Sequence, residues 1–322
     1  MRIYAFVLHG DLDGLSATAT VAAALKHAEK DAELRFYFSQ PYELDKDLAR
    51  VDPRAEGIYI VDLAIDADVW PRLSAELGKL VASKRVTWID HHPSTIERVE
   101  ELKRIGVEAM LAEAASASTI ARSFLDRVPD PAFFEKIITI GEVADRAVSV
   151  AREDPLFHYV EVLSLVLGYR VRDEQIRRRI LRAWITERVV VPDEVAKAAS
   201  EAEKVFQDLL REARLRVVYR SEKVVAVDMR DKRVYGFAGM LASIIASEEG
   251  RIALILSRVG EAALLTLRAP PGAKGNPSKT AWDVASRYGG SGGGHAGAAS
   301  FKVPGTYAEK VLAEIVRALE TG

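Results

Sequence analysis

Three short apolar runs, each ending in histidine or aspartate, constrain the fold of this chain more than any other feature. Residues 3–8 lead into His9-Gly10-Asp11-Leu12-Asp13-Gly14, residues 58–61 into Asp62, and residues 85–89 into Asp90-His91-His92. Buried strands of parallel sheets are such continuous apolar runs. Because parallel strands end at one edge of their sheet, we expect these polar groups to meet there, where open α/β sheets bind ligands.

Helix-compatible segments separate these runs. Helices are expected at 15–25, 67–79 and 95–105, and further strands at 34–38 and 107–111. The first helix would place Asp11 and Asp13 at its amino end, where the helix dipole favours anions. Strands that alternate with helices in this way predict an α/β domain with a doubly wound, mostly parallel sheet.

The rest of the chain predicts a connector and a second, smaller α/β domain. Strands are expected at 217–219, 224–228, 252–257 and 263–267, and helices at 237–246 and 282–288. Thr280 and Asp283 have capping-box spacing at the last helix. We therefore expect three parts: a metal-binding catalytic domain at 1–160, a helical connector at 161–214, and an α/β domain with a mixed sheet at 215–322.

Composition excludes several kinds of chemistry. The 322 residues include no cysteine, which excludes disulfides, thiolate metal sites and a cysteine nucleophile, so any metal must bind to nitrogen and oxygen. We find neither a run of about 20 apolar residues nor a signal-peptide pattern. The sequence therefore predicts a cytoplasmic protein without a membrane partner.

Charge is unevenly distributed along the chain. Residues 1–215 hold 30 Lys and Arg against 37 Asp and Glu, whereas residues 216–322 hold 15 against 10. An acidic part suits cations, and a basic part suits a negatively charged substrate. Uneven surface charge without a function explains the same counts equally well.

Two polar groups interrupt helical stretches of the amino-terminal half. Hydroxyls in Ser116-Ala117-Ser118-Thr119 could touch a substrate, but a helix cap is the favoured interpretation. Asp145 is expected within a mostly apolar helical stretch, where an unpaired carboxylate is costly. It therefore requires Arg146 or a cation as its partner.

An arginine-rich segment occupies residues 170–182. Its arginines are Arg170, Arg172, Arg177, Arg178, Arg179 and Arg182. These side chains could contact a nucleic acid. A solvated helix face that pairs with Asp173, Glu174 and Glu187 is the favoured interpretation.

Five glycines between residues 289 and 294 precede His295. Glycine permits positive φ and close backbone approach, so successive amides around Gly292, Gly293 and Gly294 could converge on an anion as a nest. His295 and Arg268 would add charged donors, and the planar guanidinium suits a phosphate. A flexible loop is the alternative, but the small residues after His295 favour close packing.

Together these motifs resemble those of the DHH phosphoesterase superfamily, in the same order along nearly the whole chain. Its four successive motifs match His9-x-Asp11-x-Asp13-Gly14, Asp62, Asp90-His91-His92 and Asp145. The signature of the DHH-associated carboxyl-terminal domain matches Gly292-Gly293-Gly294-His295.

The resemblance implies two divalent cations, with Mn²⁺ preferred and Mg²⁺ as the alternative. The residues that match the first site are His9, Asp11 and Asp62, and those that match the second are Asp13, Asp62, His91 and Asp145. Asp62 would bridge both ions. Ligation by oxygen and imidazole without thiolates agrees with manganese. The assignment of Asp145 stays open because Glu142 lies one helical turn earlier.

Two such ions favour phosphoester hydrolysis by in-line attack. The resemblance implies that His92 stabilises the phosphoryl oxygens or protonates the leaving oxygen, and that Asp90 orients an imidazole. Arg268 and His295, with the glycines before it, would bind another phosphate or a terminal nucleotide of the substrate. Cleavage would then require the two domains to close.

Within the superfamily, the chain most resembles compact two-domain nanoRNases and compact RecJ-like nucleases. Family II inorganic pyrophosphatases have another carboxyl-terminal domain, and full RecJ-type exonucleases usually carry an oligonucleotide-binding barrel, for which 322 residues leave no room. We therefore expect an exonuclease that releases mononucleotides from short or single-stranded RNA or DNA. The alternatives are a phosphatase of a small nucleotide such as phosphoadenosine phosphate, and a nucleic-acid-processing partner of a helicase or replisome. A homodimer, or a DNA-repair or replication protein as partner, is left open.

Overall fold

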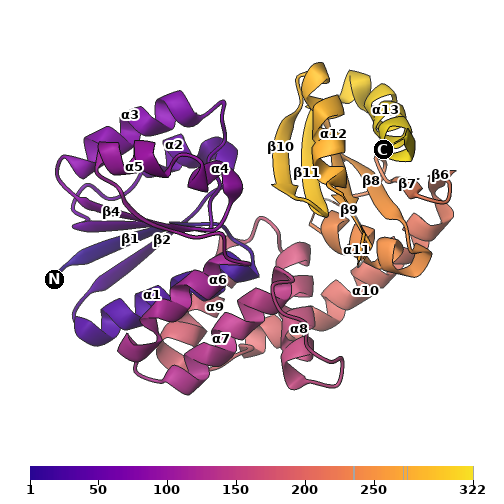
Figure 1. Cartoon of the computed structure of the whole chain (residues 1–322). Helices are drawn as coiled ribbons and strands as arrows, with labels where there is room; N and C mark the ends of the chain where they lie inside the picture. The colour runs from indigo at the N-terminus through magenta and orange to yellow at the C-terminus, as the bar shows by residue number, and fades with distance from the viewer. Residues whose placement is uncertain (235, 271, 274, 322) are drawn as a thin grey trace. The chain divides into compact units, whose positions relative to one another are not determined.

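The chain folds into two compact units. The computed structural model describes residues 1–234, 236–270, 272–273 and 275–321, except for the side chain of His295. The first unit comprises Met1–Leu167 and Arg172–Ala199, and the second comprises Gly168–Val171 and Ser200–Gly322 (Figure 1). The residues expected to form a connector, 161–214, are thus shared between the two units.

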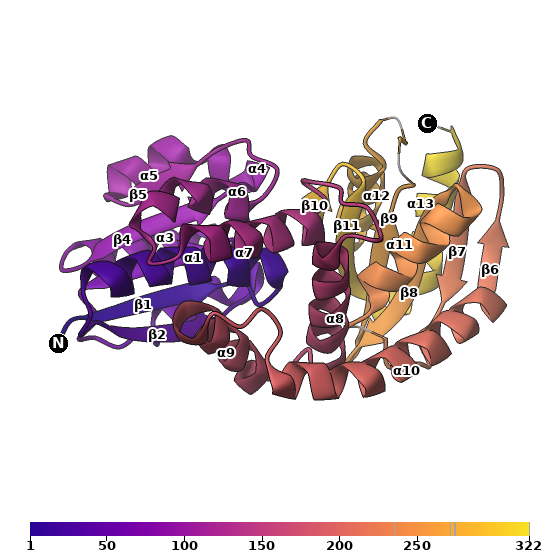
Figure 2. The same ribbon diagram turned by 90° about the horizontal axis from the view of Figure 1, so that it is seen from below.

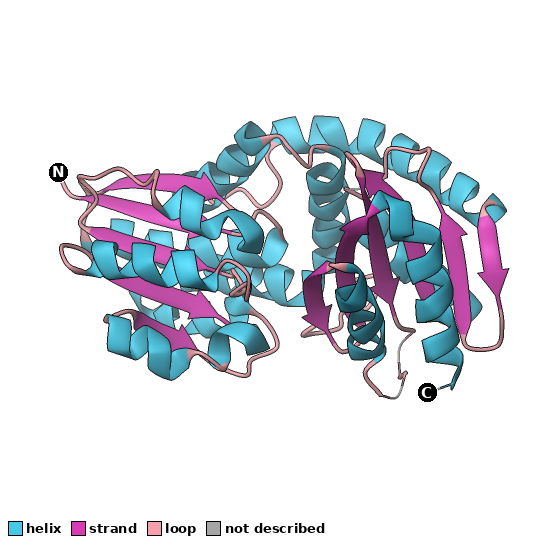
Figure 3. Ribbon diagram, turned by 90° about the horizontal axis from the view of Figure 1, so that it is seen from above, coloured by secondary structure: helices cyan, strands magenta, loops and turns pink. Residues whose placement is uncertain are grey.

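The first unit is built on a parallel sheet of five strands. The strands are β1 (Ile3–Leu8), β2 (Glu33–Phe38), β3 (Gly57–Val61), β4 (Arg85–Asp90) and β5 (Glu108–Leu111). Their order is β2-β1-β3-β4-β5, and each neighbouring pair is parallel (Figure 3). All five therefore end at one edge of the sheet. The predicted strands and their parallel arrangement are confirmed.

Helices cover both faces of this sheet, as the predicted doubly wound fold requires. In chain order the helical segments are α1 (Leu12–Ala28), η1 (Pro41–Glu43), α2 (Leu44–Leu48), α3 (Trp70–Val81), α4 (Pro93–Ile96), α5 (Val99–Ile105), α6 (Ala117–Ala121), η2 (Arg122–Arg127), α7 (Pro131–Ala144), α8 (Pro155–Tyr169), α9 (Glu174–Arg182) and the π-helical turn η3 (Ala183–Glu187). Helices α2, α3 and α5 lie on one face, and α1, α6 and α7 lie on the other (Figure 1).

Close packing between α1 and α7 fixes the end of α7. Helix α1 is rich in alanine, serine and threonine and is buried along most of its length. A Cβ added at Gly141 of α7 would collide with Ser118 Oγ and lie 2.9 Å from Ser16 Cβ. A larger residue at 141 would therefore push α7 away and move Asp145, which caps its carboxyl end.

The second unit is built on a mixed sheet of six strands, as predicted. The strands are β6 (Val217–Arg220), β7 (Val224–Asp228), β8 (Ile252–Val259), β9 (Ala262–Arg268), β10 (Ser291–His295) and β11 (Ala298–Pro304), in the order β10-β11-β9-β8-β7-β6. The pair β7 and β8 is parallel, and the other pairs are antiparallel.

Helices of the second unit pack against this sheet. They are α11 (Ala238–Glu249), α12 (Pro277–Ala285), η4 (Ser286–Tyr288), η5 (Gly305–Tyr307) and α13 (Ala308–Thr321), and α10 (Asp193–Leu215) leads into the unit. Leu265, Phe301 and Ile315 lie in its buried apolar core. Within the described part of the chain, no helix is both long and apolar enough to cross a bilayer.

Helix α12 begins earlier than the capping-box spacing predicted. Asn276 caps it by accepting a hydrogen bond from the backbone N–H of Lys279, and Pro277 occupies the first turn. Proline suits that position because its missing N–H would be unpaired there anyway. The prediction that the helix starts at residue 282, after a cap by Thr280, was therefore wrong.

The glycine-rich segment is an edge strand, so the predicted nest of amides was wrong. Ser291–His295 pairs antiparallel with β11. Gly292 and Gly294 have φ of +136° and +151°, and a Cβ on either would collide with a carbonyl oxygen of β11. Glycine is therefore required at both positions for strand pairing. At Gly293 a Cβ would meet nothing within 4 Å.

Candidate metal centre

Asp62 lies at the centre of the polar cluster, directly after β3. Its Oδ2 is 3.8 Å from His9 Nδ1, and its Oδ1 is 3.5 Å from His91 Nε2. Oxygen and nitrogen donors that share an ion through bonds of about 2 Å lie roughly 3–4 Å apart. The two carboxylate oxygens therefore face two different groups of donors.

The backbone of Asp62 is in the left-handed region, with φ of +57°. Few residues other than glycine adopt this conformation, although aspartate tolerates it better than most. Strained backbone of this kind is concentrated at functional sites. Here it turns the chain sharply at the end of β3, and the side chain of Asp62 is almost completely buried.

The first group consists of His9, Asp11 and Asp62, whose donor atoms lie within 4.8 Å of one another. His9 Nδ1 is 2.8 Å from Asp11 Oδ2. Asp11 lies at the amino end of α1, as predicted, where it is the N-cap, and its Oδ1 accepts from the N–H of Gly14 at 3.0 Å. A Cβ at Gly14 would lie 2.5 Å from the His9 carbonyl oxygen and 3.2 Å from Asp62 Oδ2, so only glycine fits there.

The second group consists of Asp13, His91 and Asp145. His91 Nε2 lies 3.9 Å from Asp13 Oδ2 and 3.7 Å from Asp145 Oδ2. His91 Nδ1 is 3.3 Å from the carbonyl oxygen of Ala114. Donation from Nδ1 to this carbonyl leaves the lone pair on Nε2, which faces the carboxylates and suits a cation.

The first turn of α6 fixes the carboxylate of Asp13. Its Oδ2 accepts from the N–H of Ala117 at 2.7 Å, and its Oδ1 accepts from the N–H of Ser118 at 2.9 Å. Ser116 Oγ accepts from the N–H of Thr119, which confirms the predicted helix cap. The hydroxyl-rich segment therefore holds an acidic side chain of the cluster in place.

Glu142 pairs with Arg122, whereas Asp145 lies near His91. Arg122 Nη2 donates to both carboxylate oxygens of Glu142, at 3.0 and 2.9 Å, and Thr119 Oγ1 also donates to one of them. Both carboxylate oxygens of Glu142 are therefore engaged in this ion pair. Of the two acidic residues considered from the sequence, only Asp145 lies in the group with His91.

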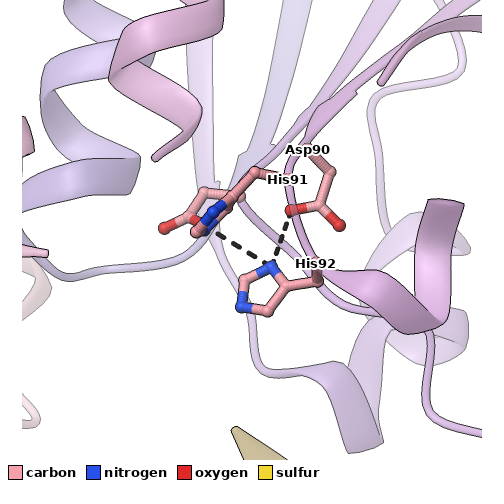
Figure 4. A group of neighbouring side chains, drawn as sticks. Asp90, His91 and His92 are labelled. Atoms are coloured by element: carbon pink, nitrogen blue, oxygen red, sulfur yellow. Dashed lines mark hydrogen bonds and ion pairs between the residues drawn. The ribbon is translucent and has the colours of Figure 1, made fainter. Parts of the chain in front are cut away.

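His92 and Asp90 form a third candidate group with Asp62 and His91, whose donor atoms also lie within 4.8 Å of one another. His92 Nδ1 is 2.7 Å from Asp90 Oδ1 (Figure 4). The same nitrogen is 3.9 Å from Asp62 Oδ1. Asp90 is fully buried, and its Oδ2 has no hydrogen-bond partner among the described residues. Burial lowers the pKa of His92, but the hydrogen bond to Asp90 and the charges of Asp90, Asp145 and Asp11 together outweigh burial and raise that pKa.

The cluster carries more negative charge than the protein alone can balance. Burial, together with the charges of Asp11 and Asp13, raises the pKa of Asp62 well above its ordinary value. Burial and the charge of Asp13 raise the pKa of Asp145 to about 8. Divalent cations reverse such shifts by supplying positive charge. The nitrogen and oxygen donors therefore fit hard or borderline divalent ions.

The substrate-binding candidates all lie in the second unit. In the sheet register, Ala298 is paired with both Arg268 and His295, so these two residues occupy one row across three adjacent strands. Arg268 Nη2 lies 2.8 Å from where a Cβ of Gly239 would be, in the first turn of α11. The side chain of His295 lies outside the described residues.

Sequence reasoning missed Arg122, described above, and was wrong in assigning Arg177 to a solvated helix face. Arg177 of α9 is buried, and its Nε donates to the carbonyl oxygen of Gly10 at 2.7 Å. Ile180 and Leu181, three and four residues after Arg177, are buried. This helical spacing placed Arg177 on the buried face of α9 and could have revealed it.

The other arginines of α9 follow the favoured prediction of a solvated, ion-paired face. Arg178 pairs with Glu174 at 3.0 Å, and Arg179 pairs with Glu187 at 2.9 Å. Arg182 also pairs with Glu187, at 3.2 Å. These contacts confirm the ion pairing that was expected from the sequence.

Comparison with known proteins identifies solved structures with a similar fold. No family model and no curated protein matches the sequence. Among solved structures, a DHH-domain protein described as a member of a family of ribosomal proteins matches with a TM-score of 0.69 and 17% identity, over 98% of this chain and 86% of that one.

Two further structures match over almost the whole chain. RecJ from Thermus thermophilus, in complex with Mn²⁺, matches with a TM-score of 0.65 and 17% identity over 98% of this chain. This chain spans 52% of that RecJ. The pGpG-specific phosphodiesterase PggH from Vibrio cholerae matches with a TM-score of 0.61 and 14% identity, over 99% of this chain and 100% of that one.

These matches and the sheet order define an α/β protein with the fold of the DHH-domain proteins. The resemblance stated from the sequence motifs is therefore confirmed at the level of the fold.

Proposed function

We propose that this protein is a phosphodiesterase that uses two divalent cations, with Mn²⁺ preferred over Mg²⁺. The observation that carries the proposal is the placement of Asp62 between two donor groups, with one carboxylate oxygen facing each. His9, Asp11 and Asp62 would hold one ion, and Asp13, Asp62, His91 and Asp145 the other. When bound, the ions would neutralise phosphoryl oxygens and lower the pKa of the attacking water.

His92 is proposed to donate the proton that the leaving oxygen requires. Asp90 would accept from Nδ1 and raises the pKa of the imidazole, which favours its charged form and directs the second proton, on Nε2, away from Asp90. A general acid at this position would stabilise the departing alkoxide. The buried Asp90 thus acts through His92, because it holds the ring in one orientation.

The proposed substrate is a short or single-stranded oligonucleotide, from which mononucleotides are released. The substrate named for PggH, pGpG, supports a nucleotide phosphodiester as the target, and Mn²⁺ in the RecJ structure supports the choice of ion. The basic second unit is proposed to bind another phosphate of the substrate through Arg268, His295 and the edge strand β10. The amino-terminal residues 1–160 would carry the catalytic groups.

Incubation with Mn²⁺ and an end-labelled oligonucleotide ladder tests this function. We expect stepwise shortening of DNA or RNA with release of mononucleotides. An intact ladder, with phosphate released from phosphoadenosine phosphate, would instead identify a small-nucleotide phosphatase. If neither substrate is cleaved, the phosphodiesterase proposal fails.

Gly293→Ala tests whether the edge strand binds substrate. The added methyl group meets nothing within 4 Å in the free protein, so the melting temperature should not change. If a substrate lies against this strand, the methyl group should weaken oligonucleotide binding about tenfold, as measured by fluorescence anisotropy.

Gly292→Ala is the matched control, because its methyl group would clash with the carbonyl oxygen of Ser300. This variant should lower the melting temperature. Unchanged oligonucleotide affinity in Gly293→Ala would remove β10 from the substrate site.

Mn²⁺ should stabilise the protein more at pH 8 than at pH 6. The folded pKa of Asp145, about 8, lies above its ordinary value, so the metal-free protein gains stability from the protonated carboxyl at low pH and loses it as pH rises through about 8. A bound cation displaces that proton. Affinity should therefore increase about tenfold per pH unit for each displaced proton below pH 8.

Thermal unfolding with and without Mn²⁺ at pH 6, 7 and 8 measures this effect. Asp145→Asn should flatten the dependence on pH, because the amide has no proton to release. An Mn²⁺-induced shift that is the same at all three pH values would contradict the assignment of Asp145.

A further inference from the structure

Arg177 links the helix α9 to the loop that carries two of the proposed metal ligands. We propose that Arg177 is a positioning residue, which holds the Gly10 carbonyl so that His9 and Asp11 keep the geometry needed for a cation. This inference rests on the proposed function, because it assigns a role towards the first of the two ions. It also gives one buried residue of α9 a role beside the proposed metal site.

The contacts of Arg177 support a fixed position for its guanidinium. Nε donates to the Gly10 carbonyl oxygen at 2.7 Å, and Nη1 donates to the carbonyl oxygen of Asp173 at 3.1 Å. The residue is only 8% exposed. Helix α9 lies beside β2 and α1 (Figure 2), so that its buried face reaches the end of β1. Hydrogen bonds from Nε and Nη1 thus hold the guanidinium of Arg177 in place.

Gly10 and Arg177 are complementary in shape. A Cβ at Gly10 would lie 2.5 Å from Arg177 Nε and 3.0 Å from its Cδ. Only glycine lets the guanidinium approach so closely. The accepting carbonyl belongs to the peptide between Gly10 and Asp11, so the hydrogen bond fixes the plane of the link between the two proposed ligands, His9 and Asp11.

A positioning role of Arg177 and a purely electrostatic role predict different effects of its removal on metal binding. Arg177 carries a positive charge close to Asp11. If it acted only as a counter-charge for the acidic cluster, it would compete with a cation, and its removal would strengthen metal binding. If it positions His9 and Asp11, its removal should weaken metal binding. The two roles therefore predict opposite signs.

Isothermal titration calorimetry of the full-length protein with Mn²⁺ tests whether removal of Arg177 weakens or strengthens metal binding. Arg177→Met should weaken one of the two Mn²⁺ sites at least about tenfold, as the loss of groups that orient metal ligands does elsewhere. Arg177→Lys keeps the charge but loses the planar Nε–H donor, so it should also weaken this site. The control Arg182→Met removes an arginine that is 75% exposed and should bind Mn²⁺ as the unmodified protein does.

Unchanged or tighter Mn²⁺ binding in Arg177→Met would overturn the inference. If the unmodified protein bound no Mn²⁺, the proposed function would fail instead, so the two failures are distinguishable. Circular dichroism without metal should show the same folded content for both methionine variants. Loss of that signal in Arg177→Met alone would mean that the residue serves folding rather than positioning.

A double-mutant cycle with Gly10→Ala tests the pair without relying on one variant. In the unmodified background, the alanine methyl group displaces the guanidinium and should weaken Mn²⁺ binding. In the Arg177→Met background the flexible thioether can move aside, so the same change should cost less affinity. Strictly additive effects on the Mn²⁺ dissociation constant would contradict coupling between Gly10 and Arg177.

Discussion

Asp62→Asn should lower kcat for oligonucleotide hydrolysis by about a thousandfold or more. The amide has nearly the shape of the carboxylate and tolerates the left-handed backbone at this position. It offers one oxygen and no charge, so it cannot serve both donor groups. Single-turnover assays with saturating Mn²⁺ measure the chemical step directly.

Asp68→Asn is the matched control for this substitution. Asp68 is exposed in the same loop and lies outside the candidate metal-binding groups of the described residues, so turnover should not change. Retained turnover in Asp62→Asn would show that Asp62 does not bridge two catalytic ions.

His92→Gln should lower kcat by about 10²–10⁴-fold and leave Mn²⁺ binding nearly unchanged. Glutamine removes the proposed proton donor but none of the proposed metal ligands. A substrate with a p-nitrophenolate leaving group needs little protonation, so its hydrolysis should be much less affected. Equal losses for both substrates would show that His92 does not protonate the leaving oxygen.

The pH profile adds a second test of the same residue. Because the pKa of His92 is raised, mainly by the hydrogen bond to Asp90 against the effect of burial, the ring is charged below that pKa and loses its proton as pH rises through it. Activity should therefore fall on the alkaline side. Asp90→Asn should move this fall to lower pH, because the hydrogen bond to a charged carboxylate is lost.

Much of the fold was predictable because it depends on local pattern. The apolar runs ended in polar residues, and parallel pairing necessarily brought His9, Asp62 and His91 to one edge of the sheet. Their metal-binding role stays a prediction. The choice between Asp145 and Glu142 needed the structure, because it depends on Arg122, which pairs with Glu142 from another element.

Contacts between distant parts of the chain could not be predicted in the same way. Arg177 and Gly10 are 167 residues apart, and no local pattern states which carbonyl a buried arginine will reach. The glycine-rich strand was misjudged for a similar reason. Its conformation is set by pairing with β11, whereas glycine alone is compatible with nests, loops and strands.

Anomalous diffraction from crystals soaked in Mn²⁺ is the most direct test of a two-ion site at Asp62. We expect two peaks, one on each side of the Asp62 carboxylate. One should lie within coordination distance of His9 and Asp11, and the other within coordination distance of His91 and Asp145. A fully soaked crystal with no peak at Asp62, or with Mn²⁺ bound only elsewhere, would contradict it.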